Sequence, residues 1–117
     1  MSLARKYTHF SRDEISDLFA HATRIERNAF WDVLVAPKQG SHARILIVVS
    51  RTLGTAPERN LIKRHIKHLF LELGWHELPC AIVLIVKRPA MKFSFEELHK
   101  KLSSVLSLIN EHTKVSK

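Results

Sequence analysis

Cysteine, long apolar runs and acidic residues are all scarce in this chain of 117 residues. Cys80 is the only cysteine, so the chain can form no internal disulfide. The longest apolar runs, Ile45 to Val49 and Ala81 to Val86, are far shorter than the roughly 20 residues that cross a bilayer. The first ten residues hold Arg5 and Lys6 but no continuous apolar stretch, unlike a secretory signal. We therefore expect a protein of the reducing cytoplasm with no membrane partner.

The shortage of acidic residues leaves a strong positive charge. The 19 Lys and Arg residues outnumber the 11 Asp and Glu residues, which gives a formal net charge of +8. Such a charge favours a polyanionic partner through long-range attraction and counterion release. Nucleic acids, anionic membranes and acidic proteins all fit that description, so charge alone does not choose between them.

The few carboxylates are also scattered along the chain. Asp13, Glu14 and Asp17 belong to one expected helix, and the others lie far from them in sequence. A two-metal phosphodiesterase needs carboxylates that converge on its ions, and no spacing in this chain requires that. The eight His residues are dispersed. The sequence therefore predicts no catalytic residue and no metal site on the protein.

Three positions have the pattern of a helix start. Ser11, Thr55 and Ser94 each have Glu three residues later, and each is followed by apolar residues at spacings of three and four. Pro57 in the first turn of the second helix and Gly74 just past its end fit the usual places of these residues. The predicted helices cover about residues 11–21, 55–73 and 94–110, and the last fades into a polar tail over residues 111–117.

Three runs of strand length are rich in β-branched and aromatic residues: Phe30 to Ala36, Ala43 to Val49 and Ala81 to Val86. The turn sequence Pro37 to Gly40 favours a hairpin between the first two. The order is helix, strand, strand, helix, strand, helix, with room for a fourth strand that no run identifies. Residues 1–117 therefore predict a single domain, an α/β (α+β) two-layer sandwich with helices packed on a small sheet.

The most informative stretch runs from Arg51 to His68 and contains a single acid, Glu58. On a helix, Arg59, Lys63 and Lys67 form one row, and Asn60, Arg64 and His68 form the adjacent row. Like charges at this spacing cost an isolated helix roughly 0.2–0.5 kcal/mol per pair, a repulsion that a phosphate-rich partner would reverse. The free amides at the helix N-terminus add a further anion site. A solvated face without a partner is the alternative for an arbitrary basic helix.

The order Ser50-Arg51-x-x-Gly54-x-Ala56-x-x-Arg59-Asn60-x-x-Lys63-Arg64 resembles the Arg-Asn-Arg signature of the bacterial ribonuclease P protein. The chain length, the strand that ends at Ser50, and the continuation Lys87-Arg88-Pro89-Ala90 are also similar to that family. The resemblance covers most of the chain and is specific in its central third. Three residues depart from the family pattern: Thr52 and Leu61 where basic residues are usual, and Pro57 where a small aliphatic residue is common.

The resemblance implies an α/β sandwich with an unusual left-handed crossover, in place of the right-handed one that generic topology rules give in about 98% of cases. It also implies that an RNA subunit removes the 5′ leader from precursor tRNA with Mg²⁺ bound mainly by that RNA. The protein would then be a non-catalytic subunit, with one copy per catalytic RNA.

The resemblance further implies two binding surfaces. Contacts to the ribonuclease P RNA would come from Arg51, Arg59, Asn60, Lys63, Arg64, Lys67 and His68. A cleft between the first helix and the sheet would hold the single-stranded leader of precursor tRNA, and its matching positions are Ile15, Phe19, Phe30 and Val33. Base stacking gives a physical reason for aromatic rings in such a cleft, although core packing is their more frequent role. Because successive strand residues face opposite sides, we expect either Phe30 or Trp31 to be exposed.

Two other functions remain open from the sequence. A ribosomal or other structural RNA-binding protein would have the same charge and size. A stand-alone nuclease would need a constellation of carboxylates that the spacing does not indicate.

Overall fold

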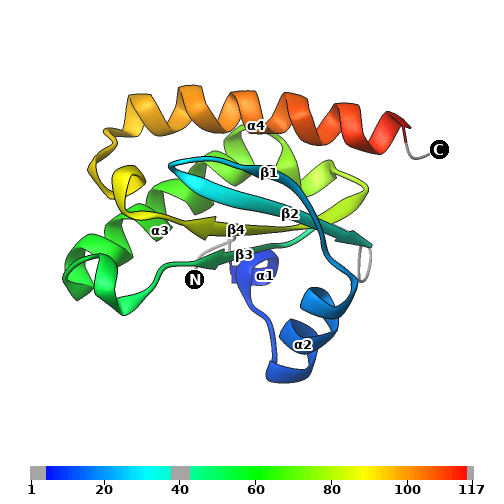
Figure 1. Cartoon of the computed structure of the whole chain (residues 1–117), viewed down its shortest axis with the longest axis horizontal. Coiled ribbons are helices and arrows are strands. Elements are labelled where there is room, and N and C mark those ends of the chain that lie inside the picture. Colours follow the sequence, from blue (N-terminus) through cyan, green and yellow to red (C-terminus); the bar gives the residue numbers. More distant parts are fainter. Residues whose placement is uncertain (1–4, 38–42, 116–117) are drawn as a thin grey trace.

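A four-stranded sheet with helices on both sides makes up the fold, which the computed structural model describes over residues 5–37 and 43–115. The elements are α1 (Arg5–Thr8), α2 (Arg12–His21), β1 (Thr23–Arg27), β2 (Trp31–Pro37), β3 (Ile45–Val48), the 3-10 turn η1 (Arg51–Leu53), α3 (Ala56–Glu72), η2 (Trp75–Glu77), β4 (Cys80–Val86), η3 (Arg88–Lys92) and α4 (Phe95–Val115). Helices α3 and α4 lie on one side of the sheet and α2 lies on the other, while α1 lies beside the edge strand β3 (Figure 1). None of the helices in the described ranges is long and apolar enough to cross a membrane. The predicted α/β class with a small sheet is confirmed.

The three predicted helix starts are confirmed. Ser11 and Thr55 each accept a hydrogen bond from the backbone N–H of the Glu three residues later, and that Glu accepts one in return from the N–H of the capping residue. Ser94 and Glu97 form the same reciprocal pair. Gly74 follows α3 with φ of 78°, the left-handed conformation that favours glycine. The sequence therefore encodes these helix ends locally.

The last helix is longer than predicted. Helix α4 continues to Val115, so the prediction of a polar tail from residue 111 is wrong. Ile109 is fully buried and anchors this end of the helix against the core. Once a helix is anchored, further residues need only propagate it, which polar residues such as Glu and Lys do readily.

The strand order β1-β2-β4-β3 places β4 inside the sheet, between β2 and β3. Strand β2 pairs antiparallel with β1 and β4, whereas β3 pairs parallel with β4. The predicted hairpin between residues 30–36 and 43–49 is therefore wrong, and its turn falls partly on residues 38–42, outside the described ranges. Strand β4 takes the inner position because it is apolar along its whole length, as a strand buried on both faces must be.

Strand β1 is the element that no apolar run identified. Its sequence has one apolar residue, Ile25, among charged and polar ones, and most of its side chains are exposed or half-buried. Its register with β2 shifts between Arg24 and Glu26, which marks a bulge at Ile25. An edge strand of this kind is held by pairing on one side, and its charged side chains discourage pairing with another chain.

Strands β3 and β4 and the helix between them form the parallel crossover of the fold. The chain leaves the edge strand β3, passes through η1 and α3, and returns as β4 beside it. The basic stretch of the sequence is therefore carried on the crossover helix. The left-handed crossover that the resemblance implies for this connection stays a prediction.

The sheet has a core on each face. The larger core packs the sheet against α3 and α4, and its strand residues include Trp31, Val33 and Val35 of β2 and Ile82, Leu84 and Val86 of β4. The smaller core joins Leu18 of α2 to Ala36, Ala81 and Val83. Beside it, four apolar side chains stay half-buried: Leu34, Leu46, Val48 and Ile85. We call this partly covered surface the open sheet face.

Arg44 ties α2 and the segment before it to the sheet. Its Nη2 donates to Glu14 Oε2 at 2.8 Å, and its Nη1 donates to the backbone carbonyl of His9 at 3.0 Å. The guanidinium carbon also lies 4.3 Å from the ring centre of Phe10. The hydrogen bond from Arg44 is the largest cause that lowers the pKa of Glu14 to about 2, with the backbone N–H of Ser11 next.

Acid is expected to remove the contribution of Glu14 to stability. Because folding lowers the pKa of this carboxyl, its stabilising effect is complete above about pH 4.5 and is lost as the pH falls toward 2. The urea midpoint of Glu14→Gln should therefore lie below that of the wild type at neutral pH, and the two should converge in acid. Glu77→Gln, at an exposed position, serves as the control. A difference in urea midpoint between Glu14→Gln and the wild type that does not change with pH would contradict this assignment.

Candidate nucleic-acid interface

The basic stretch forms a face along α3, which we call the basic face. Its half-buried row is Arg59, Lys63 and Lys67, and its exposed row is Asn60, Arg64 and His68. The half-buried row lies beside the apolar stripe that packs on the sheet, so its aliphatic stems cover apolar surface while the charged ends reach solvent. The structure therefore brings together the six α3 residues that the sequence assigned to RNA.

Arg51 joins this face from η1, where it is exposed. The turn is fixed by Arg88, whose Nη2 donates to the carbonyl of Thr52 at 2.9 Å. Arg59 Nε donates to the carbonyl of Gly54 at 3.2 Å and so ties the first turn of α3 to the end of η1. Thr52, which departs from the family pattern, thus contributes its backbone rather than a charge at this point.

Gly54 leaves room for the cap of α3. A Cβ at this position would lie 2.8 Å from Glu58 Oε1. That oxygen accepts hydrogen bonds from the backbone N–H and the side chain of Thr55, at 2.8 and 3.1 Å. These bonds lower the pKa of Glu58 and keep its carboxylate charged at the helix N-terminus. The glycine therefore preserves the cap that starts the basic face.

The Lys and Arg charges of the basic face are not neutralised within the described ranges, although His68 Nε2 lies 3.9 Å from Glu72 Oε1. Lys63, Arg64 and Lys67 form no ion pair with any carboxylate of residues 5–37 or 43–115, whereas Arg44 and Lys87 each contact one at 2.8 Å. Positive side chains that have no carboxylate of their own are available to phosphate groups. The face is therefore suited to a polyanion.

The four residues predicted for a leader cleft do not lie together. Ile15 and Phe19 lie on α2, and Phe19 is 43% exposed. Val33 has no exposed surface and faces α3 and α4, so its assignment to a cleft is wrong. Phe30 lies on that same helix side, where its ring centre is 4.9 Å from that of Phe93.

The prediction that either Phe30 or Trp31 is exposed is also wrong. Trp31 is 1% exposed and Phe30 is half-buried. The strand alternation does not apply to this pair, because β2 begins at Trp31 and Phe30 still belongs to the turn that follows β1. Both rings consequently pack against the same core.

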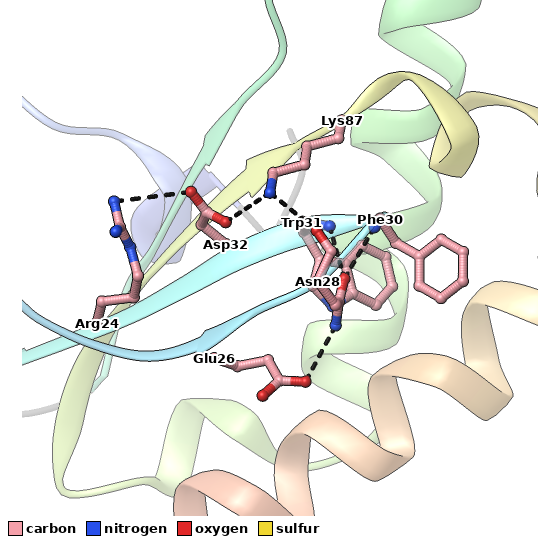
Figure 2. Close-up of polar contacts among 7 residues, drawn as sticks. All are labelled: Arg24, Glu26, Asn28, Phe30, Trp31, Asp32 and Lys87. Carbon is pink, nitrogen blue, oxygen red and sulfur yellow. Dashed lines mark hydrogen bonds and ion pairs between the residues drawn. The ribbon is translucent and has the colours of Figure 1, made fainter.

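Sequence reasoning missed a charged cluster at the end of the open sheet face, around Asp32 (Figure 2). Asp32 is the one polar residue in the described ranges that counts as buried, at 9% exposed. Its carboxylate lies 2.8 Å from Lys87 Nζ and 3.8 Å from Arg24 Nη2. A buried carboxylate is tolerated when it is paired. The sequence feature that could have revealed this cluster is Asp32 itself, an acidic residue inside an apolar run. Its carboxylate holds Arg24 and Lys87 beside the apolar side chains of the open sheet face.

The comparisons with known proteins agree with this geometry. The family model described as Ribonuclease P matches residues 3–110. The chain belongs to the ribonuclease P protein family. The ribonuclease P protein component of Listeria innocua is 30% identical over 107 residues, which cover 91% of this chain and 90% of that protein. The same component from a Geobacillus species is 30% identical over 105 residues, which cover 89% and 90%.

Solved ribonuclease P proteins have the same fold. The Staphylococcus aureus RNase P protein matches with a TM-score of 0.76 and 26% identity, over 87% of this chain and 94% of that one. The Thermotoga maritima RNase P protein matches with a TM-score of 0.72 over 85% and 94%, and its 24% identity makes it a likeness of fold alone. The chain is thus a member of a family whose proteins are components of an endoribonuclease, and it has the small mixed sheet of that family.

Proposed function

We propose that this chain binds the catalytic RNA of ribonuclease P through the basic face of α3 and supports removal of the 5′ leader from precursor tRNA. The observation that carries the proposal is the row of unneutralised cations on α3, at the place in the chain where the family signature lies. Arg64 and Arg59 bind phosphate through a planar fork, and Lys63 and Lys67 act as point charges. Asn60 can donate and accept at a sugar or base edge.

The proposed path of the leader is the open sheet face. Helix α2 packs on this side of the sheet through Leu18, and its Phe19, which is 43% exposed, offers a ring on which a base can stack. At the end of the open sheet face, Asp32 holds Arg24 and Lys87, which supply positive charge for the leader phosphates. This arrangement replaces Phe30 and Val33 of the sequence prediction, which pack on the side of α3 and α4, with residues from the opposite side of the sheet.

The proposal assigns the chemistry and most of the bound Mg²⁺ to the RNA subunit. Within residues 5–37 and 43–115, no three His, Cys, Asp or Glu side chains lie close enough to hold a metal ion. The protein binds and orients the two RNAs. A single copy per catalytic RNA and a cytoplasmic location are parts of the same proposal.

Reconstitution tests this function. Cognate ribonuclease P RNA is assayed for cleavage of precursor tRNA at low Mg²⁺, with and without the protein. We expect the protein to accelerate cleavage, because its cations take over part of the charge neutralisation that Mg²⁺ otherwise provides. The protein alone is the control and should be inactive. No acceleration at any Mg²⁺ concentration would contradict the proposal.

A structural role on another RNA is the second candidate. The net charge of +8 and the basic face would serve a ribosomal protein equally well. Co-purification separates the two: recovery of the chain with ribosomal subunits, and not with ribonuclease P RNA, would favour the structural role.

A further inference from the structure

The exposed row of the basic face continues past His68 to an acidic residue. At the helical spacing of four, Asn60, Arg64 and His68 are followed by Glu72, the last residue of α3. Glu72 is exposed, and its carboxylate repels RNA phosphates. RNA that follows the exposed row therefore meets a negative charge at the end of α3.

Two imidazoles contact the Glu72 carboxylate. Its Oε1 lies 3.9 Å from Nε2 of His68 on the same helix, and its Oε2 lies 3.8 Å from Nε2 of His99 on α4. The three side chains are between 47% and 62% exposed, so both solvent and RNA can reach them. Glu72 thus joins a residue assigned to RNA to one that the proposed function leaves unused. We call these three side chains the junction cluster.

The surroundings of the junction cluster are mostly cationic. The titratable and charged groups within one helical turn of its two imidazoles on α3 and α4 are, in addition to Glu72, Arg64, His65, Lys67, Glu96 and Lys100. Phe95 of α4 packs between the helices, with its ring centre 5.1 Å from that of His65 and 5.6 Å from that of His68. This contact keeps the end of the exposed row beside α4.

Protonation reverses the charge of the junction cluster. Histidine gains its positive charge as the pH falls through the range from about 8 to 5. With both imidazoles neutral, the cluster carries the single negative charge of Glu72. With both protonated, two positive charges and one negative leave a net positive charge. The C-terminal end of a helix also favours a cation, which suits a charged His68 at the end of α3.

We propose that Glu72 is the boundary of the RNA-binding surface, and that protonation of His68 and His99 extends this surface from α3 onto α4, where His99 contacts an RNA phosphate. In alkaline conditions the carboxylate ends the contact at His68. In acid the two imidazoliums neutralise the carboxylate, and the line of cations continues to His99. The inference rests on the proposed binding of ribonuclease P RNA and states how the extent of that contact depends on pH.

The test is the affinity of the full chain for cognate ribonuclease P RNA at pH 5.5 and pH 8.0, each across a salt series. One added phosphate contact should make binding at pH 5.5 about fivefold tighter and steepen the log-log salt slope by about 1. Equal affinity at the two pH values overturns this inference and leaves the proposed function standing. A chain that binds the RNA at neither pH overturns the proposed function itself.

Histidine variants locate the pH dependence. The double variant His68→Gln, His99→Gln should lose most of the gain at pH 5.5, and His99→Gln alone should abolish the steeper slope. The matched control is His9→Gln, His21→Gln, which removes two exposed imidazoles from outside α3 and α4. His21 also contacts a carboxylate, with its Nδ1 3.4 Å from Asp17 Oδ1, yet this control should keep the gain. Equal losses in the two double variants, or an unchanged slope in His99→Gln, overturn the extension onto α4.

A carboxylate variant tests the boundary. Glu72→Gln should bind the RNA about threefold more tightly than the wild type at pH 8.0, where Glu72 carries the charge of the junction cluster. Glu77→Gln removes the same charge from an exposed position in η2 and should change affinity less than about 1.5-fold. Equal effects of the two variants overturn the boundary. So does a Glu72→Gln variant that changes only the urea midpoint, since the contacts would then serve to tie α4 to α3.

Discussion

Replacing Lys63, Arg64 and Lys67 together with Gln is expected to weaken binding to ribonuclease P RNA by a factor on the order of 100 at physiological salt. No carboxylate of the described ranges neutralises these side chains, so their charge is available to RNA phosphates. If about five phosphates are contacted, log affinity should fall against log salt with a slope on the order of −4, and the triple variant should bring the slope to about −2. Arg64→Ala alone should weaken binding in the same direction. Filter binding across a salt series measures both quantities.

A second triple variant controls for net charge. Arg12, Lys92 and Lys100 are exposed and lie outside α3, so changing all three to Gln removes the same charge from other surfaces. This control should lose little affinity. Equal losses in the two triple variants would mean that bulk charge, rather than the basic face, governs binding. A flat response to salt would contradict the phosphate contacts themselves.

Phe70→Ala is expected to lower the free energy of unfolding by about 3–5 kcal/mol. The side chain is 1% exposed, and its ring centre lies 5.7 Å from that of Tyr7 and 6.3 Å from that of Trp75. Truncation would leave a cavity where α3 meets η2 and the segment of α1. A domain of this size is stable by only about 5–15 kcal/mol, so urea denaturation should show a variant close to the limit of folding.

Phe19→Ala is the matched control for Phe70→Ala. Its side chain is 43% exposed, so the same truncation should cost less than about 1 kcal/mol of stability. It should nevertheless weaken leader binding by about 1–3 kcal/mol, the usual value of one stacked base. The contribution of the leader is measured as the difference in binding free energy between precursor tRNA, which carries the leader, and mature tRNA, which lacks it. An unchanged difference would contradict the proposed path of the leader over the open sheet face.

The parts of the fold that sequence predicted are those encoded by neighbouring residues. The caps at Ser11, Thr55 and Ser94 each need only a residue three positions away, and the left-handed Gly74 needs only its own lack of a side chain. The two rows of the basic face follow from helical periodicity in the same way. Such features depend only on residues within one or two helical turns, so they form regardless of where the helix packs in the fold.

The parts that sequence did not predict depend on distant partners. Nothing within residues 30–49 shows that β4 will separate β2 from β3, and the hairpin prediction failed for that reason. Strand β1 lacks an apolar run because pairing on one side is enough to hold it. The exclusion of Val33 from the leader surface follows from which face of β2 meets α3 and α4. The pairing of Asp32 with Lys87 likewise joins segments far apart in the chain.

The central place of β4 governs when the molecule can assemble. Strands β2 and β3 are made early, yet each lacks its inner neighbour until Cys80–Val86 has been synthesised. Contacts between such distant segments form late, because a long loop must close before they contribute. During that interval helix α3 lacks the complete sheet on which it packs. A nascent chain therefore exposes the basic residues before it can hold them in rows, and an organised RNA-binding surface appears only when synthesis has passed the last strand.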